Sequence, residues 1–443
     1  RVLHRAIGAS AIGNADEWFD YGVYAYLATH IAASLFPGDE EGSGVVYTLL
    51  GFALSFLVRP IGGMIWGPLG DRIGRRRVLA MTIMLMAMST LAVGLIPSYE
   101  TIGILAPILL YALRMVQGLS AGGEYGGAAT FMAEYAPDRK RGFYGSFLEV
   151  GTLTGFVLGN SIALLLVNSL DDAAMESWGW RLPFLLAAPL GLIGLYLRMR
   201  IEDTPVFREV AERDETEAVT GVYRDLVTKY LRCILTLFGL VIALNVVNYT
   251  LLSYTPTYLQ NTIGMDESDA LLVPLLGQIA MLVTLPFFGR LSDRVGRRPM
   301  WLFSCITLSI AVIPCYLLIG TSLAGAIVGF AIIGMLYAPQ LATISATFPA
   351  MFPTIVRFAG VAIGYNVATS MFGGTAPVIN QTVIDATGND LIPAFYMVGA
   401  CLVGIVAAWF LIETKGASLR GTEIPGTPEA AEEQRELAAS SSR

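Results

Sequence analysis

The sequence predicts an all-α membrane protein with twelve transmembrane helices in two six-helix halves. Three observations predict this fold class. Of the 443 residues, 55% are hydrophobic and only 14% are charged, and the mean hydropathy is +0.62. Apolar stretches of about 20 residues, the length that crosses a bilayer, recur along the whole chain. A charged motif near residue 70 returns in the second half.

Glycine, proline and charged residues separate the apolar stretches, so they set the expected boundaries of the spans. The first half is expected to span the membrane at residues 12–36, 45–70, 78–97, 102–133, 143–168 and 181–199. The second half follows a charged connection, with spans expected at residues 231–260, 270–289, 300–320, 322–350, 358–385 and 391–412. This predicts an N-terminal bundle (1–200), a cytoplasmic linker (201–229), a C-terminal bundle (230–415) and a flexible cytoplasmic tail (416–443).

Charge in the connections predicts the orientation. The connections after odd-numbered spans contain no Lys or Arg and read "PGDEEGSG", "PSYE", "NSLDDAAMESWGW", "NTIGMDESD", "GTS" and "TGND". Those after even-numbered spans include "DRIGRRR", "PDRKR", "DRVGRRP" and "PTIVR". Because Lys and Arg are retained on the cytoplasmic side, both termini are expected to be cytoplasmic.

Two motifs repeat between the halves. "GPLGDRIGRRR" at 67–77 returns as "GRLSDRVGRRP" at 289–299, and the spacing Pro-x-x-x-Arg occurs at 137–141 and at 353–357. Two halves with the same orientation, joined by a cytoplasmic loop, describe a transporter built from parallel repeats around a site near the midplane.

These motifs and four further stretches carry a family resemblance. "GNADEWFDYGVY", "RMVQGLSAGGEYGGAATFMAEYAPDRKRG", "IEDTPVF" and "PAMFPTIVR" resemble the metabolite–proton symporters of the major facilitator superfamily, and most closely the osmoregulatory proline/glycine-betaine symporters. The resemblance implies proton-coupled symport of a small zwitterion by alternating access in a bacterial inner membrane. It implies neither a cofactor nor a nucleic-acid partner. Relatives in this family carry 2-oxoglutarate, shikimate or citrate, so an organic acid is the alternative substrate.

Ionisable residues inside the expected spans are costly and therefore point to function. Asp20 and Glu124, with Glu17 as a further candidate, are predicted to carry the coupled proton. Asp16 is expected at the cytoplasmic edge, and Glu149 beside the basic loop is a structural or a functional acid. Glu17, Asp20, Tyr21 and Tyr24 follow the spacing i, i+3, i+4, i+7 and should share one helical face.

Two arginines also fall inside the spans of the first half. Arg114 is expected near the midplane, where it either binds the carboxylate of a substrate or pairs with a carboxylate of the first span. Arg59, just before Pro60, is assigned to the cytoplasmic gate, with a place in the binding site as the alternative. In an organic-acid symporter the two arginines would hold a dicarboxylate.

Aromatic residues suit the cationic end of a zwitterion, because the faces of Trp and Tyr attract a quaternary ammonium. The predicted substrate-binding residues beside Arg114 are Trp18, Tyr21, Tyr24, Asn245, Asn248, Tyr249, Tyr254, Tyr337 and Asn366. The resemblance assigns the repeated loops to gating, through Asp71, Arg72, Arg75, Asp293, Arg294 and Arg297. Asp71 and Asp293 are expected to cap or pair with neighbouring helix ends.

Other classes of protein are disfavoured. The four cysteines (Cys233, Cys305, Cys315, Cys401) fall in apolar spans without metal-ligand spacing, so neither a disulfide nor a metal site is expected. The sequence shows no nucleotide-binding loop and no nucleophile with a base, which argues against an enzyme. The repeat with its gating loops argues against a channel. Glycines at 151, 155 and 159 predict a close-packing helix face, and the tail at 416–443 shows no apolar heptad.

Overall fold

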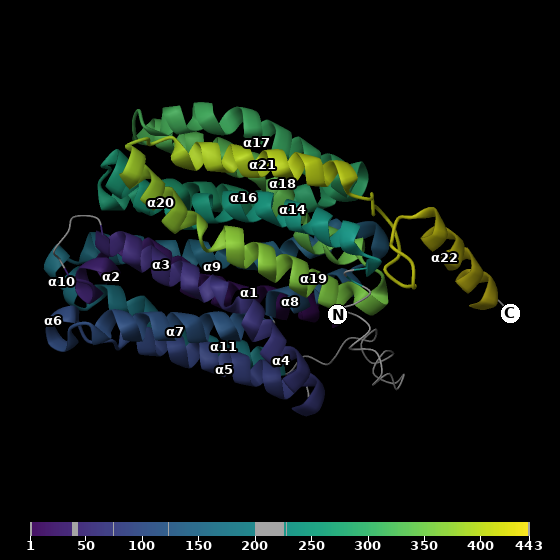
Figure 1. Cartoon of the computed structure of the whole chain (residues 1–443), viewed down its shortest axis with the longest axis horizontal. Coiled ribbons are helices and arrows are strands. Elements are labelled where there is room, and N and C mark those ends of the chain that lie inside the picture. The colour runs from purple at the N-terminus through teal and green to yellow at the C-terminus, as the bar shows by residue number, and fades with distance from the viewer. Residues whose placement is uncertain are drawn as a thin grey trace.

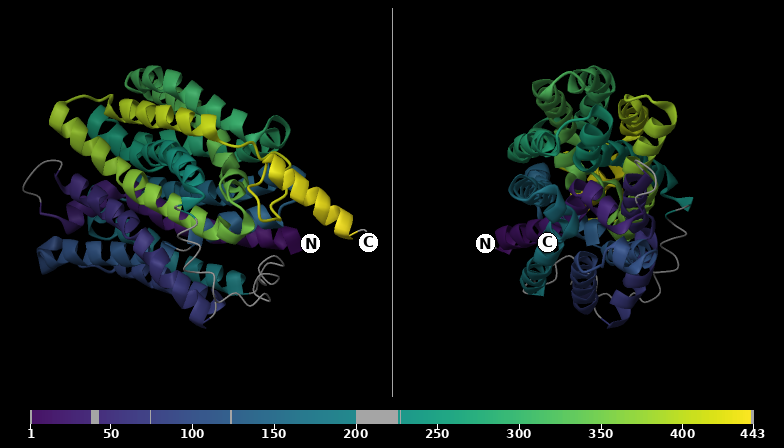
Figure 2. Two further views of the ribbon diagram at one scale, coloured as in Figure 1. Left: turned by 45° about the vertical axis from the view of Figure 1, so that its right-hand side comes forward. Right: turned by 90° about the vertical axis from the view of Figure 1, so that its left-hand side faces the viewer.

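The computed structural model describes residues 2–37, 43–73, 75–122, 124–199, 226 and 228–441. Over these residues the chain forms helices packed side by side in two layers (Figure 1). The first half forms one layer, drawn in purple and blue, and the second half forms the other, drawn in green and yellow. The layers stay distinct when the molecule is turned (Figure 2).

Helices cover all six spans expected in the first half. The main helices are α1 (Val2–Tyr26), α3 (Ser43–Leu57), α4 (Arg59–Ile73), α5 (Arg75–Gly94), α7 (Leu105–Ala121), α8 (Glu124–Tyr135), α9 (Arg141–Ser169) and α11 (Leu182–Met199). Shorter helices are α2 (Ala28–Leu35), α6 (Tyr99–Ile102) and α10 (Asp172–Ser177).

The second half repeats this plan, and helices cover its six expected spans as well. They are α14 (Leu231–Asn248), α15 (Thr255–Tyr258), α16 (Glu267–Val295), α17 (Arg297–Ile319), α18 (Leu323–Thr347), α19 (Thr354–Ala368), α20 (Ala376–Thr387) and α21 (Ile392–Phe410). The C-terminal segment, which the sequence predicts to be a flexible tail, contains helix α22 (Pro428–Ser441).

The outer surface matches a lipid environment. Seven stretches among the described residues are long and apolar enough to cross a membrane. Large apolar side chains point outward on both halves, among them Met64, Val283 and Ile310, each more than two-thirds exposed. In water such a surface would be costly, whereas lipid tails are as apolar as these side chains.

The two ends of the bundle differ in charge, and we name them accordingly. The basic end carries residues 67–73, 75–77, 137–141, 289–299 and 353–357 and both chain termini, which lie at the right in Figure 1. The acidic end carries residues 37, 43–44, 169–181 and 261–269, near α2 and α10 at the left.

Pro60 divides the second span and thereby places Arg59. Proline has no N–H group, so it is tolerated in the first turn of a helix but not in the interior. α3 ends at Leu57, Val58 forms a turn, and α4 begins at Arg59. Arg59 therefore stands at the break between two helices, in the middle of the molecule.

Two spans of the second half are interrupted by wider π-helical turns. One covers Tyr249–Tyr254 and precedes Pro256, and the other covers Thr369–Gly373 and precedes Pro377. Each proline lies in the first turn of the helix that resumes the span. Such turns are uncommon and often occur at functional sites, and here they place Tyr249 against the first half.

The predicted glycine face of α9 is confirmed, and it packs against α1. A Cβ atom on Gly151 would lie 2.2 Å from the carbonyl oxygen of Ala11, and one on Gly155 would lie 2.4 Å from that of Ala15. Both distances are too short for any side chain. The close approach fixes α1, which carries most of the candidate site.

We therefore expect Gly155→Ala to destabilise the fold by about 1–3 kcal/mol, because the added methyl group would press on a backbone carbonyl. Thermal unfolding of the purified protein in detergent measures this change. Gly399→Ala is the matched control, since Gly399 also lies in a helix but a Cβ there would meet nothing within 4 Å. Equal unfolding temperatures for the two variants would contradict the predicted close approach.

Candidate functional site

A buried ion pair lies at the centre of the molecule. Nη2 of Arg59 donates to Oε1 of Glu17 over 3.0 Å, and both side chains are at most 3% exposed. Glu17 comes from the middle of α1 and Arg59 from the break between α3 and α4. Removing two charges from water is costly, and here the mutual attraction of the pair offsets part of that cost.

Aromatic rings surround the guanidinium group. The Arg59 carbon Cζ lies 4.3 Å from the ring centre of Phe56, 4.9 Å from that of Tyr21 and 5.9 Å from that of Trp18. Tyr249, from the other half, packs against Phe56 and Trp18 with ring centres 5.0 and 6.0 Å apart. We call Glu17, Trp18, Tyr21, Phe52, Phe56, Arg59 and Tyr249 the central cluster.

Several polar atoms of the central cluster have no hydrogen-bond partner among the described residues. They are Nε and Nη1 of Arg59 and the hydroxyl groups of Tyr21 and Tyr249. Buried donors are normally satisfied, and each exception calls for an explanation. These four groups converge where the two halves meet, which makes the central cluster the strongest candidate for a ligand site.

A second polar system joins Asp20 to Arg114 inside the first half. Nη1 of Arg114 donates to Oε1 of Gln117 over 2.8 Å, and Nε2 of Gln117 donates to Oγ1 of Thr90 over 2.7 Å. Thr90 donates in turn to Oδ2 of Asp20 over 2.7 Å. All four side chains are buried, and we call this chain the Asp20–Arg114 relay.

The relay bears on one of the two roles that the sequence leaves open for Arg114, pairing with a carboxylate of the first span. Among the described residues Arg114 makes no ion pair within 4.0 Å, so the expected direct salt bridge to the first span is not formed by this residue. Arg59 makes that bridge instead. Arg114 stacks on Tyr24, with Cζ 4.0 Å from the ring centre, and also contacts Tyr21 at 5.2 Å.

The predicted face of α1 is confirmed. Glu17, Asp20, Tyr21 and Tyr24 all turn toward the helices of the first half. Tyr24 donates to the carbonyl of Thr48 over 2.7 Å, while Tyr21 packs against Phe56.

Tyr125, Phe52 and Phe56 were missed by the sequence interpretation. Tyr125 donates a short hydrogen bond to Glu149 and stacks on Tyr365 of the other half, with ring centres 4.7 Å apart. Glu149 is 2% exposed, and its role as a structural or a functional acid stays a prediction. Tyr125 adjoins Glu124 in "GGEYGG", and this glycine-flanked aromatic residue was the available signal.

The remaining predicted substrate-binding residues lie in the second half, and their side chains make several separate hydrogen bonds. Tyr337 donates to Oδ1 of Asn248 over 2.9 Å, so these two are brought together. Asn245 bonds to Thr369, and Tyr254 bonds to Gln381. Asn366 crosses to the first half and donates to the Gly122 carbonyl over 2.9 Å. None of these hydrogen bonds, all between described residues, joins them to Arg59 or Arg114.

Four predicted residues have side chains outside the described part of the structure. They are Glu124, Asp71, Arg72 and Arg75. Their backbone lies in α8, α4 and α5, and their roles stay predictions.

At the basic end, Asp293 confirms the predicted capping. Its two carboxylate oxygens accept the backbone N–H groups of Gly142 and Phe143 over 2.8 and 2.9 Å. It thus caps the N-terminus of α9, where the helix dipole favours a negative charge. Asp293 also accepts from Arg297 of its own motif, whereas Arg294 offers its carbonyl to Lys415.

The repeated Pro-x-x-x-Arg motif has the same geometry in both halves. Nε of Arg141 donates to the Ala133 carbonyl, and Nε of Arg357 donates to the Pro349 carbonyl, each eight residues upstream. Their Nη2 groups then bind the C-terminal segment.

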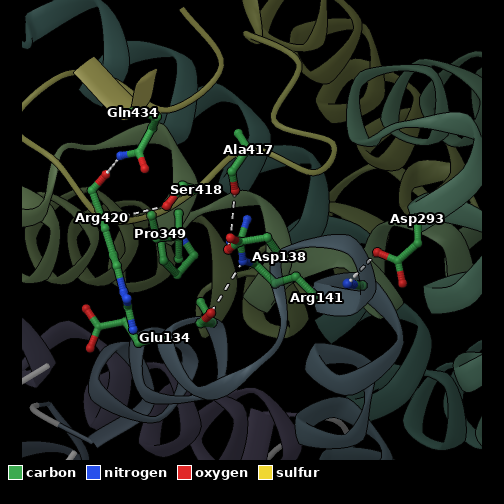
Figure 3. Close-up of polar contacts among 12 residues, drawn as sticks. Glu134, Asp138, Arg141, Asp293, Pro349, Ala417, Ser418, Arg420 and Gln434 are labelled. Carbon is green, nitrogen blue, oxygen red and sulfur yellow. Dashed lines mark hydrogen bonds and ion pairs between the residues drawn. The ribbon is translucent and has the colours of Figure 1, made fainter. Parts of the chain in front are cut away.

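The C-terminal segment therefore bridges both halves at the basic end. Arg141 donates to the carbonyl of Ala417 over 3.0 Å, and Arg357 donates to that of Leu419 over 2.7 Å. Figure 3 shows Arg141, Ala417 and Asp293 in this region. Farther on, the backbone N–H of Thr422 donates to Glu433 of α22 and lowers the pKa of that carboxyl.

The halves also meet at the acidic end. Nε2 of His30 lies 2.7 Å from Oε1 of Glu267, and Tyr26 donates to the carbonyl of Leu252 over 3.1 Å. With Asp293 and Asn366 holding the other side, contacts close the interface on both sides of the central cluster.

Comparison with known proteins identifies the class. The family model described as Major Facilitator Superfamily matches residues 18–377. The chain belongs to this superfamily, and it is a multi-pass membrane transporter and not an enzyme. The fold agrees with solved structures of the xylose transporter XylE from E. coli, including a partially occluded inward-open form (TM-score 0.70, 18% identity, 94% of this chain and 99% of that chain).

Curated relatives are closer in sequence. The chain is 41% identical to the glycine betaine/proline/ectoine/pipecolic acid transporter OusA of Dickeya dadantii and to the proline/betaine transporter of Escherichia coli, in each case over 95% of this chain and 85% of the relative. It is 39% identical to the ectoine/proline transporter ProP of Corynebacterium glutamicum, over 95% of this chain and 86% of the relative.

The ion pair of the central cluster generates a stability prediction. Arg59→Gln leaves Glu17 buried without its partner, and we expect it to destabilise the protein by about 3–5 kcal/mol. The double variant Glu17→Gln/Arg59→Gln removes both charges and should recover part of this loss.

Thermal unfolding of both single variants and the double variant completes a double-mutant cycle. Additive effects of the two substitutions would mean that the two charges do not interact.

Proposed function

We propose that this transporter is a proton-coupled symporter of a small zwitterionic osmolyte, proline or glycine betaine, in the inner membrane of a bacterium. One observation carries the proposal. Arg59 is fully buried, has two nitrogen atoms without a hydrogen-bond partner among the described residues, and is enclosed by aromatic rings beside a carboxylate.

The charges of the central cluster match a zwitterion. A carboxylate of the substrate can bind the nitrogen atoms of Arg59 that have no hydrogen-bond partner among the described residues. Arg114, which contacts Tyr21 of the central cluster, remains the other candidate for this carboxylate. The ammonium end can then lie against the faces of Trp18, Tyr21 and Tyr249, near Glu17. This exchange replaces one internal ion pair by two pairings with the substrate, and the total charge of the cluster stays the same.

A dicarboxylate fits the same site less well. It would bring two negative charges to a cluster that holds one guanidinium and one carboxylate. The names of the curated relatives, which include proline, betaine and ectoine, support the zwitterion over the organic acid.

The coupled proton is proposed to bind Asp20, with Glu124 and Glu17 as further carriers. Asp20 is 6% exposed and one of its oxygens has no hydrogen-bond partner among the described residues. A buried carboxylate of this kind is costly when ionised, so proton uptake there can be linked to the transport cycle.

We propose that alternating access opens the basic end and the acidic end of the bundle one at a time. The bundles at 1–200 and 230–415 would move as units joined by the linker at 201–229, with the basic end and both termini in the cytoplasm. Asp71, Arg72, Arg75, Asp293, Arg294 and Arg297 are the proposed gate residues at that end. Arg59, which pairs with Glu17 at the centre of the molecule, would respond to the binding of substrate there.

Substrate choice is tested in proteoliposomes that contain the purified protein. We expect counterflow of labelled proline or glycine betaine, competed by the unlabelled zwitterion and not by 2-oxoglutarate, shikimate or citrate. Counterflow of an organic acid alone would overturn the zwitterion and support the alternative substrate class.

Coupling is tested by Asp20→Asn. We expect this variant to lose accumulation driven by an inwardly directed proton gradient and to keep counterflow exchange, because exchange requires no net movement of protons. Labelled substrate uptake with and without a protonophore measures the two activities. Wild-type accumulation by both Asp20→Asn and Glu124→Gln would exclude these acids as the coupling residues.

A further inference from the structure

Two neutral side chains, Gln117 and Thr90, connect the charges of Arg114 and Asp20. Neither residue is assigned a role by the sequence motifs or by the comparisons. Both are at most 1% exposed, and they come from different helices, α7 and α5. Two neutral polar groups buried between opposite charges call for an explanation beyond packing.

The directions of the hydrogen bonds in the relay are fixed by chemistry. Arg114 can only donate, so the oxygen of the Gln117 amide must face it, and the amide nitrogen must face Thr90. That nitrogen can also only donate, so the Thr90 hydroxyl accepts from Gln117. The single hydrogen of Thr90 is then left for another acceptor.

Thr90 has two acceptors within reach of this hydrogen. Oδ2 of Asp20 lies 2.7 Å away and the carbonyl oxygen of Met86 lies 3.0 Å away. When Asp20 is ionised, its carboxylate is the stronger acceptor. Every bond of the relay then points from the guanidinium toward the carboxylate.

Protonation of Asp20 changes this arrangement. A proton on Oδ2 can be donated to the second lone pair of the Thr90 hydroxyl, and the hydrogen of Thr90 turns to Met86. A proton on Oδ1 would find no acceptor among the described residues, because that oxygen has no partner there. Oδ2 is therefore the favoured position.

We propose that Gln117 and Thr90 are positioning residues of the transport cycle, and that the Thr90 hydroxyl changes acceptor from Asp20 to the Met86 carbonyl when Asp20 takes up its proton. The last bond of the relay then reverses, and Arg114 loses the negative charge that the relay presents to it. This inference rests on the proposed function, in which Asp20 carries the coupled proton.

The protonation of Asp20 changes the surroundings of Arg114. Its Nε already lacks a partner among the described residues, and its bond to Ser55 is long at 3.4 Å. Once Asp20 is neutral, a guanidinium in a low-dielectric site favours a new anion nearby. Because Arg114 also contacts Tyr21 of the central cluster, its uncompensated charge adds to that of Arg59. Proton binding at Asp20 thus raises the affinity of the central cluster for a substrate carboxylate, which is the coupling that symport requires.

Other charges act on Asp20 and must be considered in any test of pH dependence. They are Asp16 and Glu17 on its own helix and Arg114 on α7. The described side chains of α5 include no ionisable group, and those of α11 include one, Tyr196, which is 51% exposed. The variants below leave all of these charges in place.

The experiment compares Thr90→Val, Thr90→Ala and Thr90→Ser in the purified full chain. Loss of the hydroxyl removes a charge-assisted hydrogen bond to ionised Asp20. The pH at which counterflow of labelled glycine betaine is half-maximal should therefore move by about one to two units toward alkaline pH in the Val and Ala variants. Thr90→Ser keeps a hydroxyl and should restore the wild-type profile. Ser89→Ala is the matched control, since the Ser89 hydroxyl bonds only to the Leu85 carbonyl.

A second readout needs no transported substrate. Infrared difference spectra recorded against pH follow the protonated carboxyl group of Asp20, which Asp20→Asn identifies by loss of its band. Thr90→Val should shift the titration of this band in the same direction. The spectra also test the relay if a Thr90 variant is stable but inactive in transport.

The outcomes of these experiments distinguish the proposed relay from the proposed substrate. A wild-type pH profile and an unshifted band in Thr90→Val overturn the relay, even if betaine is transported. A shifted band in a protein that transports neither proline nor betaine supports the relay and refutes the proposed substrate. Equal shifts in Thr90→Val and Ser89→Ala would also overturn the inference, because they would show a general effect of altering α5.

Discussion

The ion pair between Arg59 and Glu17 is the interaction on which the central architecture depends. A buried guanidinium is tolerated only where a carboxylate and polarisable surfaces replace water. Pro60 breaks the second span so that Arg59 faces α1, and the close approach of α1 to α9 holds Glu17 in place. The aromatic rings of both halves then close around the pair. Each of these features compensates for a charge that the membrane would otherwise exclude.

The first half contains two charge systems that differ in design. Glu17 and Arg59 touch directly at the junction of the halves, where a substrate can reach them by separating the bundles. Asp20 and Arg114 are kept apart and communicate through neutral groups inside one bundle. A direct pair can be opened by a ligand with matching charges, whereas a relayed pair responds to the protonation of its acid. The two systems share helix α1 and the ring of Tyr21, which contacts both guanidinium groups.

At each end of the bundle, hydrogen bonds of moderate strength hold the two halves together, as an alternating-access transporter requires. Asp293 caps α9 across the interface, and the two motif arginines at 141 and 357 each hold a carbonyl of the C-terminal segment. His30 and Glu267 meet at the other end. Each of these contacts joins polar groups, so water can replace it when that side opens. The internal repeat explains why the same contact between an arginine and a backbone carbonyl occurs twice at the basic end.

The sequence by itself determined the class of fold, the number and position of the spans, the repeat and the shared face of α1, because hydropathy, loop charge and helical periodicity are local properties. It also singled out the acids and arginines inside the spans as candidates, since charge in a membrane span is rare. Only the tertiary structure decided their partners: Arg59 and not Arg114 bonds to the first span, Glu149 receives Tyr125, and Thr90 and Gln117 join the relay. Threonine, glutamine and phenylalanine are common in membrane helices, so nothing in the sequence distinguishes the few that converge. Pairing depends on how helices from distant parts of the chain pack, which no local pattern records.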